Sequence, residues 1–406
     1  MKLVSMIAVV ARYTFIITSL FVAAQVSNNQ SVNVINAPYD KQLTILFAGD
    51  IMQHGPQINA ALVDSTGSYN YFPCFEYVAP IIRSKDVAIA NLECTLAGKP
   101  YTGYPQFSAP DKLVDAIKDA GFDILATANN HSCDRGDKGI IRTVKVLDSL
   151  EIKHTGTFKD STDYLKNNPL IFTVNDITVA LLNYTYGTNG LTFNYPAMVN
   201  IVDEQKVIDD INKAKNLNPD FIIVFFHWGN EYERYPTDQQ LHLAKVSKEN
   251  GADAVIGSHP HVIQPFEYVK QTDSTQRNQL VVYSLGNFVS NQRDRYRDGG
   301  AMVGFTLLKT WNRKTIIDPK YYLTWVYTPI ENNKKQYYIL PANISINEAD
   351  STLNNDIANR GRKFQLQDYN RIKNISEDDM LKMTIFINDS RNHLNTYPGA
   401  IPESVY

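Results

Sequence analysis

The feature of this sequence that most constrains its fold is a regular alternation of short apolar runs with amphipathic stretches. Runs of strand length that are nearly continuous in apolar residues occur at 43–48, 87–90, 124–127, 177–182, 221–226 and 254–256. Such runs are typical of strands buried on both faces of a sheet. Between them, helical spacing with Pro or Gly near its start occurs at 110–120, 136–150, 202–216 and 236–250. The alternation predicts an α/β fold in which helices flank a sheet.

The pattern changes after about residue 261. Strand-like runs follow one another without intervening helices, at 262–269, 280–283, 302–308 and 321–327. They predict a second, more antiparallel sheet. Beyond Glu331 the composition shifts to Asn, Lys, Asp and Gln, with a helix expected at 352–365. We therefore expect one main domain over 42–330 and a small C-terminal appendage over 331–406.

The N-terminus is typical of an exported protein. An apolar run over 13–24 follows Arg12 and ends in Val22-Ala23-Ala24, which predicts a signal peptide over 1–24 that is cleaved after Ala24. The alternative is a retained membrane anchor, because Arg12 is the only charged residue between Leu3 and Val26. Residues 25–41 are polar and lack periodicity, as in a linker. Both alternatives predict a periplasmic or envelope-associated protein.

Charge and cysteine content exclude several classes of function. The chain has 39 basic and 42 acidic residues, a formal net charge of −3, and its basic residues are scattered. No nucleic-acid partner is therefore expected. The cysteines, Cys74, Cys94 and Cys133, have no CxxC spacing. The absence of this spacing excludes a zinc finger and a thioredoxin-type site.

Polar residues stand where the apolar runs stop. The residues at these positions are Asp50, Glu93, Asn130 with His131, His227, and the pair His259 and His261 around a proline. The carboxyl ends of strands in an open α/β sheet converge on the crevice where ligands bind. We therefore expect these side chains to meet in one site.

These residue types suit divalent metal ions. Carboxylates and neutral imidazoles are ligands of zinc, manganese and iron, and a carboxylate can bridge two ions. Two ions about 3.5–4 Å apart lower the pKa of water and hold substrate oxygens, so no serine or cysteine nucleophile is needed. Each residue also has a plainer interpretation: Asp50 as a helix N-cap, or Asn130 and His131 as turn residues. His227 and the His-Pro-His element carry the metal hypothesis furthest, because a histidine continuing a buried strand needs a polar partner.

Several motifs, in order along the chain, match one known family. They are Phe-Ala-Gly-Asp-Ile-Met (47–52), Asn-Leu-Glu-Cys (91–94), Ala-Asn-Asn-His-Ser-Cys-Asp-Arg-Gly (128–136), His-Trp-Gly-Asn-Glu-Tyr (227–232), Gly-Ser-His-Pro-His-Val-Ile-Gln (257–264) and Tyr-Ser-Leu-Gly-Asn-Phe-Val (283–289). Together they resemble the CapA/PgsA poly-γ-glutamate capsule biosynthesis family, which is similar to the calcineurin-like metallophosphoesterases. The resemblance extends over roughly residues 43–310. It implies a four-layer αββα sandwich.

The resemblance also implies roles for the residues at the strand ends. Asp50 and His261 would hold a first metal ion, Glu93 would bridge, and a second ion would be held by Asn130, His227 and His259. His131, beside Asn130 in the catalytic motif, would be the general acid. One departure stands out: the phosphoesterase pattern Asp-x-His has Met52 at its third position here. Either His54 folds back to replace that imidazole, or the site holds one ion or binds metal weakly.

Residues beside these motifs are candidates for binding a substrate: Glu231, Tyr232, Phe107 and Asn287. For the two aromatic residues, plain packing is the alternative. The resemblance implies a metal-dependent hydrolase in envelope polymer biosynthesis that cleaves a phosphoester or an amide. Its partners would be an envelope polymer or phosphoester substrate and a capsule-synthesis membrane complex. The alternative is a non-catalytic accessory subunit that binds the polymer in such a complex.

Overall fold

The computed structural model describes residues 40–271, 277–331, 333–342 and 375–404. The expected signal peptide at 1–24, nearly all of the expected linker at 25–41, and the helix expected at 352–365 lie outside these residues. Within the described ranges, no helix combines the length and the apolar character needed to cross a bilayer.

The larger of two main sheets is built around β1 (Lys41–Ile51). It runs in the order β20 (Tyr338–Pro341), β17 (Lys314–Tyr327), β16 (Gly299–Lys309), β1, β4 (Val87–Leu92), β5 (Ile124–Ala126) and β6 (Lys153–Thr155). Strands β1, β4, β5 and β6 are parallel, whereas β16, β17 and β20 are antiparallel to their neighbours. A short strand, β15 (Asn287–Val289), pairs with the end of β1 in parallel.

The second sheet has its long strands in parallel. Its order is β13 (Phe266–Val269), β14 (Gln279–Val282), β12 (Ala254–Ser258), β11 (Phe221–His227), β9 (Ile177–Thr185) and β8 (Leu170–Val174). Only the edge strands β8 and β13 are antiparallel to their neighbours. The parallel strands correspond to the continuous apolar runs of the sequence, as expected for strands covered on both faces.

The prediction that the strands at 262–327 form a second, more antiparallel sheet is wrong. Strands β13 and β14 extend the sheet of β12, whereas β15, β16 and β17 join the sheet of β1. The pattern of apolar residues indicates that a segment is a strand, but it does not specify the neighbour with which the strand pairs. Both sheets are therefore mixed.

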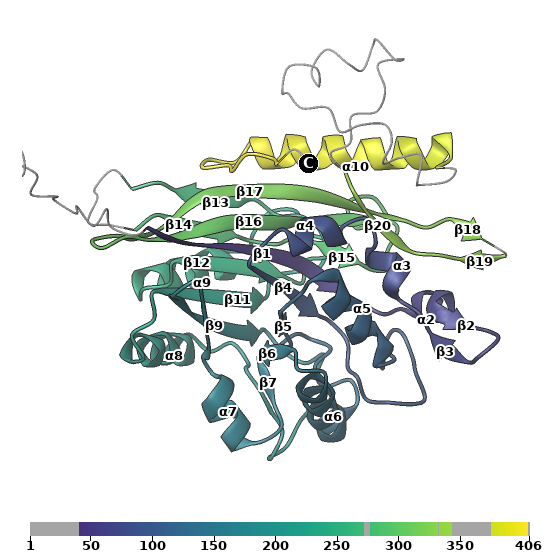
Figure 1. The fold of residues 1–406 in the computed structure, drawn as a ribbon, viewed down its shortest axis with the longest axis horizontal. Helices are drawn as coiled ribbons and strands as arrows, with labels where there is room; N and C mark the ends of the chain where they lie inside the picture. Colours follow the sequence, from purple (N-terminus) through teal and green to yellow (C-terminus); the bar gives the residue numbers. More distant parts are fainter. Residues whose placement is uncertain (1–39, 272–276, 332, 343–374, 405–406) are drawn as a thin grey trace, which may run out of the picture. The chain divides into compact units, whose positions relative to one another are not determined.

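The two sheets pack face to face between helices, which confirms the expected four-layer αββα arrangement (Figure 1). Alternate residues of β1 point to opposite sides. Phe47 faces Phe225 of the other sheet, and Leu46 faces the helices α4 (Ala79–Arg83) and α5 (Lys112–Ala120). On the second sheet, Val224 faces α8 (Glu204–Asn216) and α9 (Asp238–Glu249). The apolar core thus lies in three layers.

The helices begin and end where local chemistry dictates. The Asp203 carboxylate accepts from the backbone N–H of Lys206 at the start of α8, and the Thr237 side chain accepts from that of Gln240 at the start of α9. Helix α5 ends at Gly121, which has a φ of 108°. Smaller elements complete the unit: α2 (Gly55–Ala61), β2 (Leu62–Val63), β3 (Ser68–Tyr69), α3 (Phe72–Phe75), α6 (Gly136–Ser149), β7 (Thr157–Phe158), α7 (Ser161–Asn167), β10 (Met198–Val199), β18 (Ile330–Glu331) and β19 (Lys334–Lys335).

The described part of the C-terminal segment is integrated into this unit. Strand β20 pairs with β17, and helix α10 (Glu377–Asn395) buries Met383, Phe386 and Leu394 in the same apolar cluster as the facing sides of the two sheets. The described residues from Lys41 onward form one compact unit. The described residues beyond Glu331 therefore complete one edge of a sheet and cover part of the core.

Candidate metal centre

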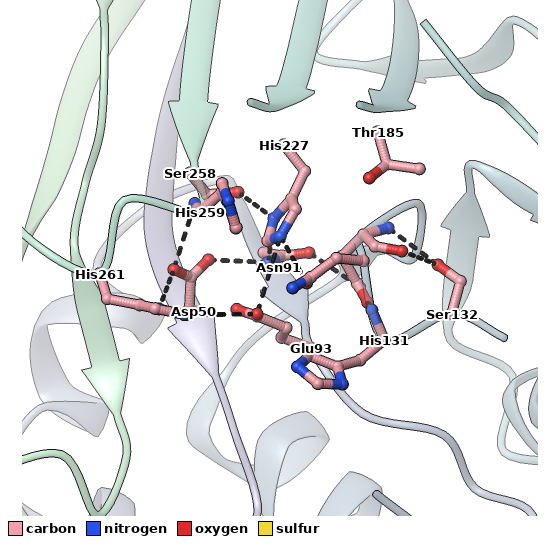
Figure 2. Close-up of polar contacts among 12 residues, drawn as sticks. Asp50, Asn91, Glu93, His131, Ser132, Thr185, His227, Ser258, His259 and His261 are labelled. Atoms are coloured by element: carbon pink, nitrogen blue, oxygen red, sulfur yellow. Dashed lines mark hydrogen bonds and ion pairs between the residues drawn. The ribbon is translucent and has the colours of Figure 1, made fainter. Parts of the chain in front are cut away.

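The polar residues at the strand ends meet at one edge of the sandwich (Figure 2). Asp50 lies near the end of β1 and Glu93 directly follows β4. His227 is the last residue of β11, while His259 and His261 follow β12. All five side chains are buried. The carboxyl ends of two strands from each sheet therefore supply the cluster, as the sequence predicts.

Residues 259–261 have an unusual backbone. His259 and His261 have positive φ values of 99° and 57°, which non-glycine residues rarely adopt. Two contacts hold the loop: the backbone N–H of Tyr232 donates to the Pro260 carbonyl at 2.7 Å, and that of His259 donates to Asp50 Oδ2 at 3.3 Å. Strain of this kind is concentrated at functional sites, where the surrounding structure maintains it.

Asp50, Glu93 and His261 form a first group of ligand atoms, all within 4.8 Å of one another. His261 Nδ1 lies 3.2 Å from Asp50 Oδ2, and His261 Nε2 lies 3.7 Å from Glu93 Oε1. Two amides orient the group. Asn91 Nδ2 donates to Asp50 Oδ1 at 2.7 Å, and Asn287 Oδ1 lies 3.1 Å from His261 Nδ1.

Glu93 also belongs to a second group, with His227 and His259, whose ligand atoms again lie within 4.8 Å of one another. His227 Nε2 is 3.7 Å from Glu93 Oε1 and 2.9 Å from Asn130 Oδ1. Its other nitrogen, Nδ1, lies 3.0 Å from Ser258 Oγ. Asn130 therefore lies beside the second group, where the sequence places it.

The pKa shifts of the buried carboxylate and imidazoles favour the binding of a metal cation. Burial, together with the nearby Asp50 and Glu231, raises the pKa of Glu93 well above its ordinary value. Burial and the neighbouring imidazoles hold the pKa of His227 well below its ordinary value and lower that of His259 to about 3. Both histidines are therefore neutral at pH 7, the form that binds metals.

Three buried polar atoms of the cluster have no hydrogen-bond partner in the described part of the chain. They are both carboxylate oxygens of Glu93 and Nδ1 of His259. Leaving a buried carboxylate without donors is costly. Divalent ions bound to both groups would satisfy these atoms. The residues present thus fit one or two such ions.

His131 is fixed from two sides. Its Nδ1 donates to Asp134 Oδ2 at 2.8 Å, and the Phe107 ring packs edge-on against it at 4.5 Å between centroids. The same Asp134 oxygen accepts from the backbone N–H of Phe107 at 2.6 Å. These contacts leave Nε2 as the ring nitrogen that can exchange a proton with a bound molecule.

The structure brings neither Met52 nor His54 into the ligand groups. Met52 is buried in the apolar cluster on the helix side of the larger sheet. His54 packs against the Phe107 ring, and its Nδ1 accepts from the backbone N–H of Asn291 at 3.3 Å. Burial lowers the pKa of His54 to about 4. His54 therefore does not replace the imidazole that Met52 fails to supply.

The candidate substrate-binding residues differ in position. Phe107 is fully buried and supports His131, so the packing interpretation holds and it does not line a groove. Asn287 is also fully buried and orients His261. Glu231 and Tyr232 are exposed at the rim, and the Tyr232 ring lies 6.2 Å from that of His261.

Several residues at this site have no role predicted from the sequence. Asp134 and Asn91 orient site residues through hydrogen bonds. The Tyr186 ring, 42% exposed, lies 4.6 Å from that of His259 and nearly parallel to that of His227. Tyr186 directly follows β9, so its position at the end of an apolar run is a signal that could have predicted it.

A family model described as bacterial capsule synthesis protein PGA_cap matches residues 44–292. The chain is 30% identical over 303 residues to the capsule biosynthesis protein CapA of Bacillus anthracis, covering 71% of this chain and 69% of that protein. The chain belongs to the bacterial capsule synthesis family. It is also 31% identical over 294 residues to the PGA biosynthesis protein CapA of Bacillus subtilis strain 168, covering 69% and 72% of the two chains.

Two solved structures have a similar arrangement. The NAD nucleotidase of Haemophilus influenzae aligns with a TM-score of 0.45 and 13% identity, over 88% of this chain and 68% of that one. The calcineurin-like phosphoesterase YfkN of Bacillus subtilis aligns with a TM-score of 0.38 and 12% identity, over 79% and 96%. The segment matched to the capsule synthesis family, 44–292, contains all the residues of the two ligand groups, whereas β16, β17, β20 and α10 lie beyond it.

Proposed function

We propose that this protein is an exported, metal-dependent hydrolase in the biosynthesis of an envelope polymer of the poly-γ-glutamate type. The similarity to a capsule biosynthesis protein and to a PGA biosynthesis protein supports the polymer. The buried cluster of carboxylates and imidazoles at the strand ends supports metal-dependent hydrolysis. The protein would act in the periplasm or at the cell envelope, together with a capsule-synthesis membrane complex.

The observation that carries this proposal is Glu93, a buried carboxylate shared by two groups of ligand atoms. Asp50 and His261 would hold a first ion, Glu93 would bridge, and Asn130, His227 and His259 would hold a second. Manganese, iron and zinc all suit this set of donors. When bound, such ions polarise phosphoryl or carbonyl oxygens and lower the pKa of water.

The chain's own residues supply the proton transfer. His131 protonates the leaving group from Nε2, while the Asp134 carboxylate on Nδ1 holds the ring and stabilises its positive charge. Phe107 limits the tilt of the ring from one side. These roles serve a phosphoester and an amide of a capsule or wall polymer equally well, so the substrate assay must distinguish the bonds.

A second candidate is a non-catalytic subunit that binds the polymer in the synthesis complex. The burial of Met52 in the apolar cluster favours it, because the first ligand group then has His261 as its one imidazole and lacks the second imidazole that the phosphoesterase pattern supplies at position 52. A site with an incomplete ligand set can keep binding without turnover.

Metal analysis of the purified protein separates the two candidates. Wild type, the double variant His227→Ala plus His259→Ala, and a control variant His242→Ala are loaded with manganese, iron or zinc and then assayed on a phosphodiester and a γ-glutamyl polymer. His242 is exposed and pairs with Glu204, so its loss removes one imidazole outside the cluster. We expect one or two ions in wild type and control, their loss in the double variant, and parallel loss of hydrolysis. A wild type without stoichiometric metal would leave the polymer-binding role.

A further inference from the structure

The loop that follows β11 brings another carboxylate to the metal centre. A carboxylate oxygen of Glu231 lies within 4.8 Å of a ring nitrogen of His259 and one of His261. Unlike the buried ligands, Glu231 is exposed and approaches from the solvent side. The adjacent hydrogen bond from the Tyr232 N–H to the Pro260 carbonyl, 2.7 Å long, fastens this loop to residues 259–261. The position of Glu231 is therefore linked to that of both histidines.

The first ligand group has room for another donor. It consists of two carboxylates and one imidazole, from Asp50, Glu93 and His261. The side chains of Met52 and His54 are engaged elsewhere. Zinc takes four ligands, and harder ions such as manganese take more oxygen donors. A carboxylate from the solvent side would complete such a shell.

The charges agree with this arrangement. Asp50 belongs to the same group of ligand atoms as Glu93, and both Asp50 and Glu231 are near enough to Glu93 to raise its pKa. Both oxygens of the buried Glu93 are without hydrogen-bond partners in the described part of the chain. The nearby arginine, Arg297, stacks on the Tyr232 ring at 4.2 Å and pairs with Asp294. One or two divalent cations therefore balance the three carboxylates to within one charge.

We propose that Glu231 is a ligand of the first metal ion and takes the place left by Met52. This inference rests on the metal site of the proposed function and assigns Glu231 to the metal instead of to the substrate. It also explains why a chain that lacks the imidazole at position 52 keeps the remaining ligand groups together.

The test compares full-length wild type with Glu231→Gln, using Glu233→Gln as the matched control. Glu233 is an exposed glutamate in the same loop, so the control makes the same change in charge. Each protein is stripped, titrated with Mn²⁺, and examined by calorimetry, elemental analysis and electron paramagnetic resonance. Thermal melts of the metal-free proteins establish that all three are folded.

We expect wild type and Glu233→Gln to bind two ions that give a spin-coupled signal. Glu231→Gln should bind one ion, or bind the second at least about tenfold more weakly, with the spectrum of an isolated Mn²⁺. Wild-type stoichiometry and affinity in Glu231→Gln would overturn this assignment and leave the proposed function standing. No Mn²⁺ bound by wild type would overturn both.

Discussion

At the scale of single residues, Asp134 fixes the orientation of His131 through the 2.8 Å contact with Nδ1. An asparagine has the same shape and can still accept from the Phe107 N–H, but it carries no charge to stabilise a protonated ring. We therefore expect Asp134→Asn to lower kcat by about tenfold to a hundredfold, which is part of the about 10²–10⁴-fold that general acid catalysis contributes, because His131 itself is retained. The number of bound ions should not change.

The dependence on the leaving group distinguishes this positioning role from a general structural defect. The loss of kcat in Asp134→Asn should be largest for substrates with poor leaving groups, which need the proton most. Equal losses for good and poor leaving groups would contradict the role of Asp134.

The effect of Glu93 on the stability of the protein should depend on whether metal is bound. Its pKa is raised in the folded state, so its contribution to the stability of the metal-free protein falls as the pH rises above the ordinary glutamate value. Without metal at pH 7, we expect Glu93→Gln to be more stable than wild type by about 1–3 kcal/mol, because the amide is cheaper to bury. The difference should shrink toward pH 4, where the carboxyl of wild type is protonated.

Metal should reverse this order. With Mn²⁺ present, wild type gains the binding free energy and Glu93→Gln gains less, so wild type becomes the more stable protein. Denaturant unfolding of both proteins between pH 4 and 8, with and without metal, measures the effect. A metal-free wild type that is more stable than Glu93→Gln at pH 7 would contradict it.

The strand-end residues could be predicted from sequence because the signal is local: a polar residue ends an apolar run. The structure brings Asp50, Glu93, Asn130, His227, His259 and His261 together. Burial and indirect contacts could not be predicted in this way. Phe107 and Asn287 sit beneath the site, and Asp134 acts only through His131. Nothing in a short motif distinguishes a side chain that contacts a ligand from one that supports its neighbour.

At the scale of elements, helix α10 is tied to the loops around the metal centre. Arg295 makes two 2.8 Å hydrogen bonds to the Asp389 carboxylate, and Arg234 donates to the Asp389 carbonyl at 2.9 Å. His393 Nε2 donates in turn to the Arg234 carbonyl at 2.7 Å. Because Arg234 follows the Glu231 loop closely, α10 holds the base of that loop.

His393 makes this attachment sensitive to acid. Burial and the nearby Arg234 lower its pKa from an ordinary 6.5 to about 4. A lowered folded-state pKa means that stability is lost as the pH falls from about 6.5 toward 4, since the unfolded chain takes up the proton first. We expect hydrogen exchange in α10, corrected for intrinsic rates, to rise between pH 7 and pH 5. His393→Gln should show a smaller rise, and equal protection of wild-type α10 at both pH values would contradict the prediction.

Helix prediction succeeded where end signals are strong. Helices α5, α6, α8 and α9 lie within about two residues of their expected bounds, helped by caps such as Asp203, Thr237 and Gly121. Helix α10 was not predicted, although Met383, Phe386, Ile387 and Leu394 recur at helical spacing. The polar composition around it obscured that period. Strand partners were not predictable, because pairing over long sequence distances leaves no local signature.

At the scale of the whole molecule, the segment beyond Glu331 should not be removable. Truncation after Glu331 would expose the core surface that Met383, Phe386 and Leu394 cover, and each such side chain contributes about 1.5–3 kcal/mol when buried. It would also leave β17 without β20 at one edge of the sheet. We expect the truncated protein to be insoluble or to melt well below wild type. A soluble product with the wild-type melting temperature would show that this segment is a separate appendage.

The position of β1 also has a consequence for how the chain acquires its structure. In β1, Leu46 pairs with Ala88 of β4 on one edge and with Gly304 of β16 on the other. The second edge of this first strand therefore pairs with residues that are more than 250 positions later in the sequence. During synthesis, the N-terminal strand leaves the ribosome long before that partner exists. Contacts between such distant residues slow folding and leave an unpaired edge open to aggregation. This edge of β1 can therefore pair only after residues 299–309 have been synthesised, and until then it is open to aggregation.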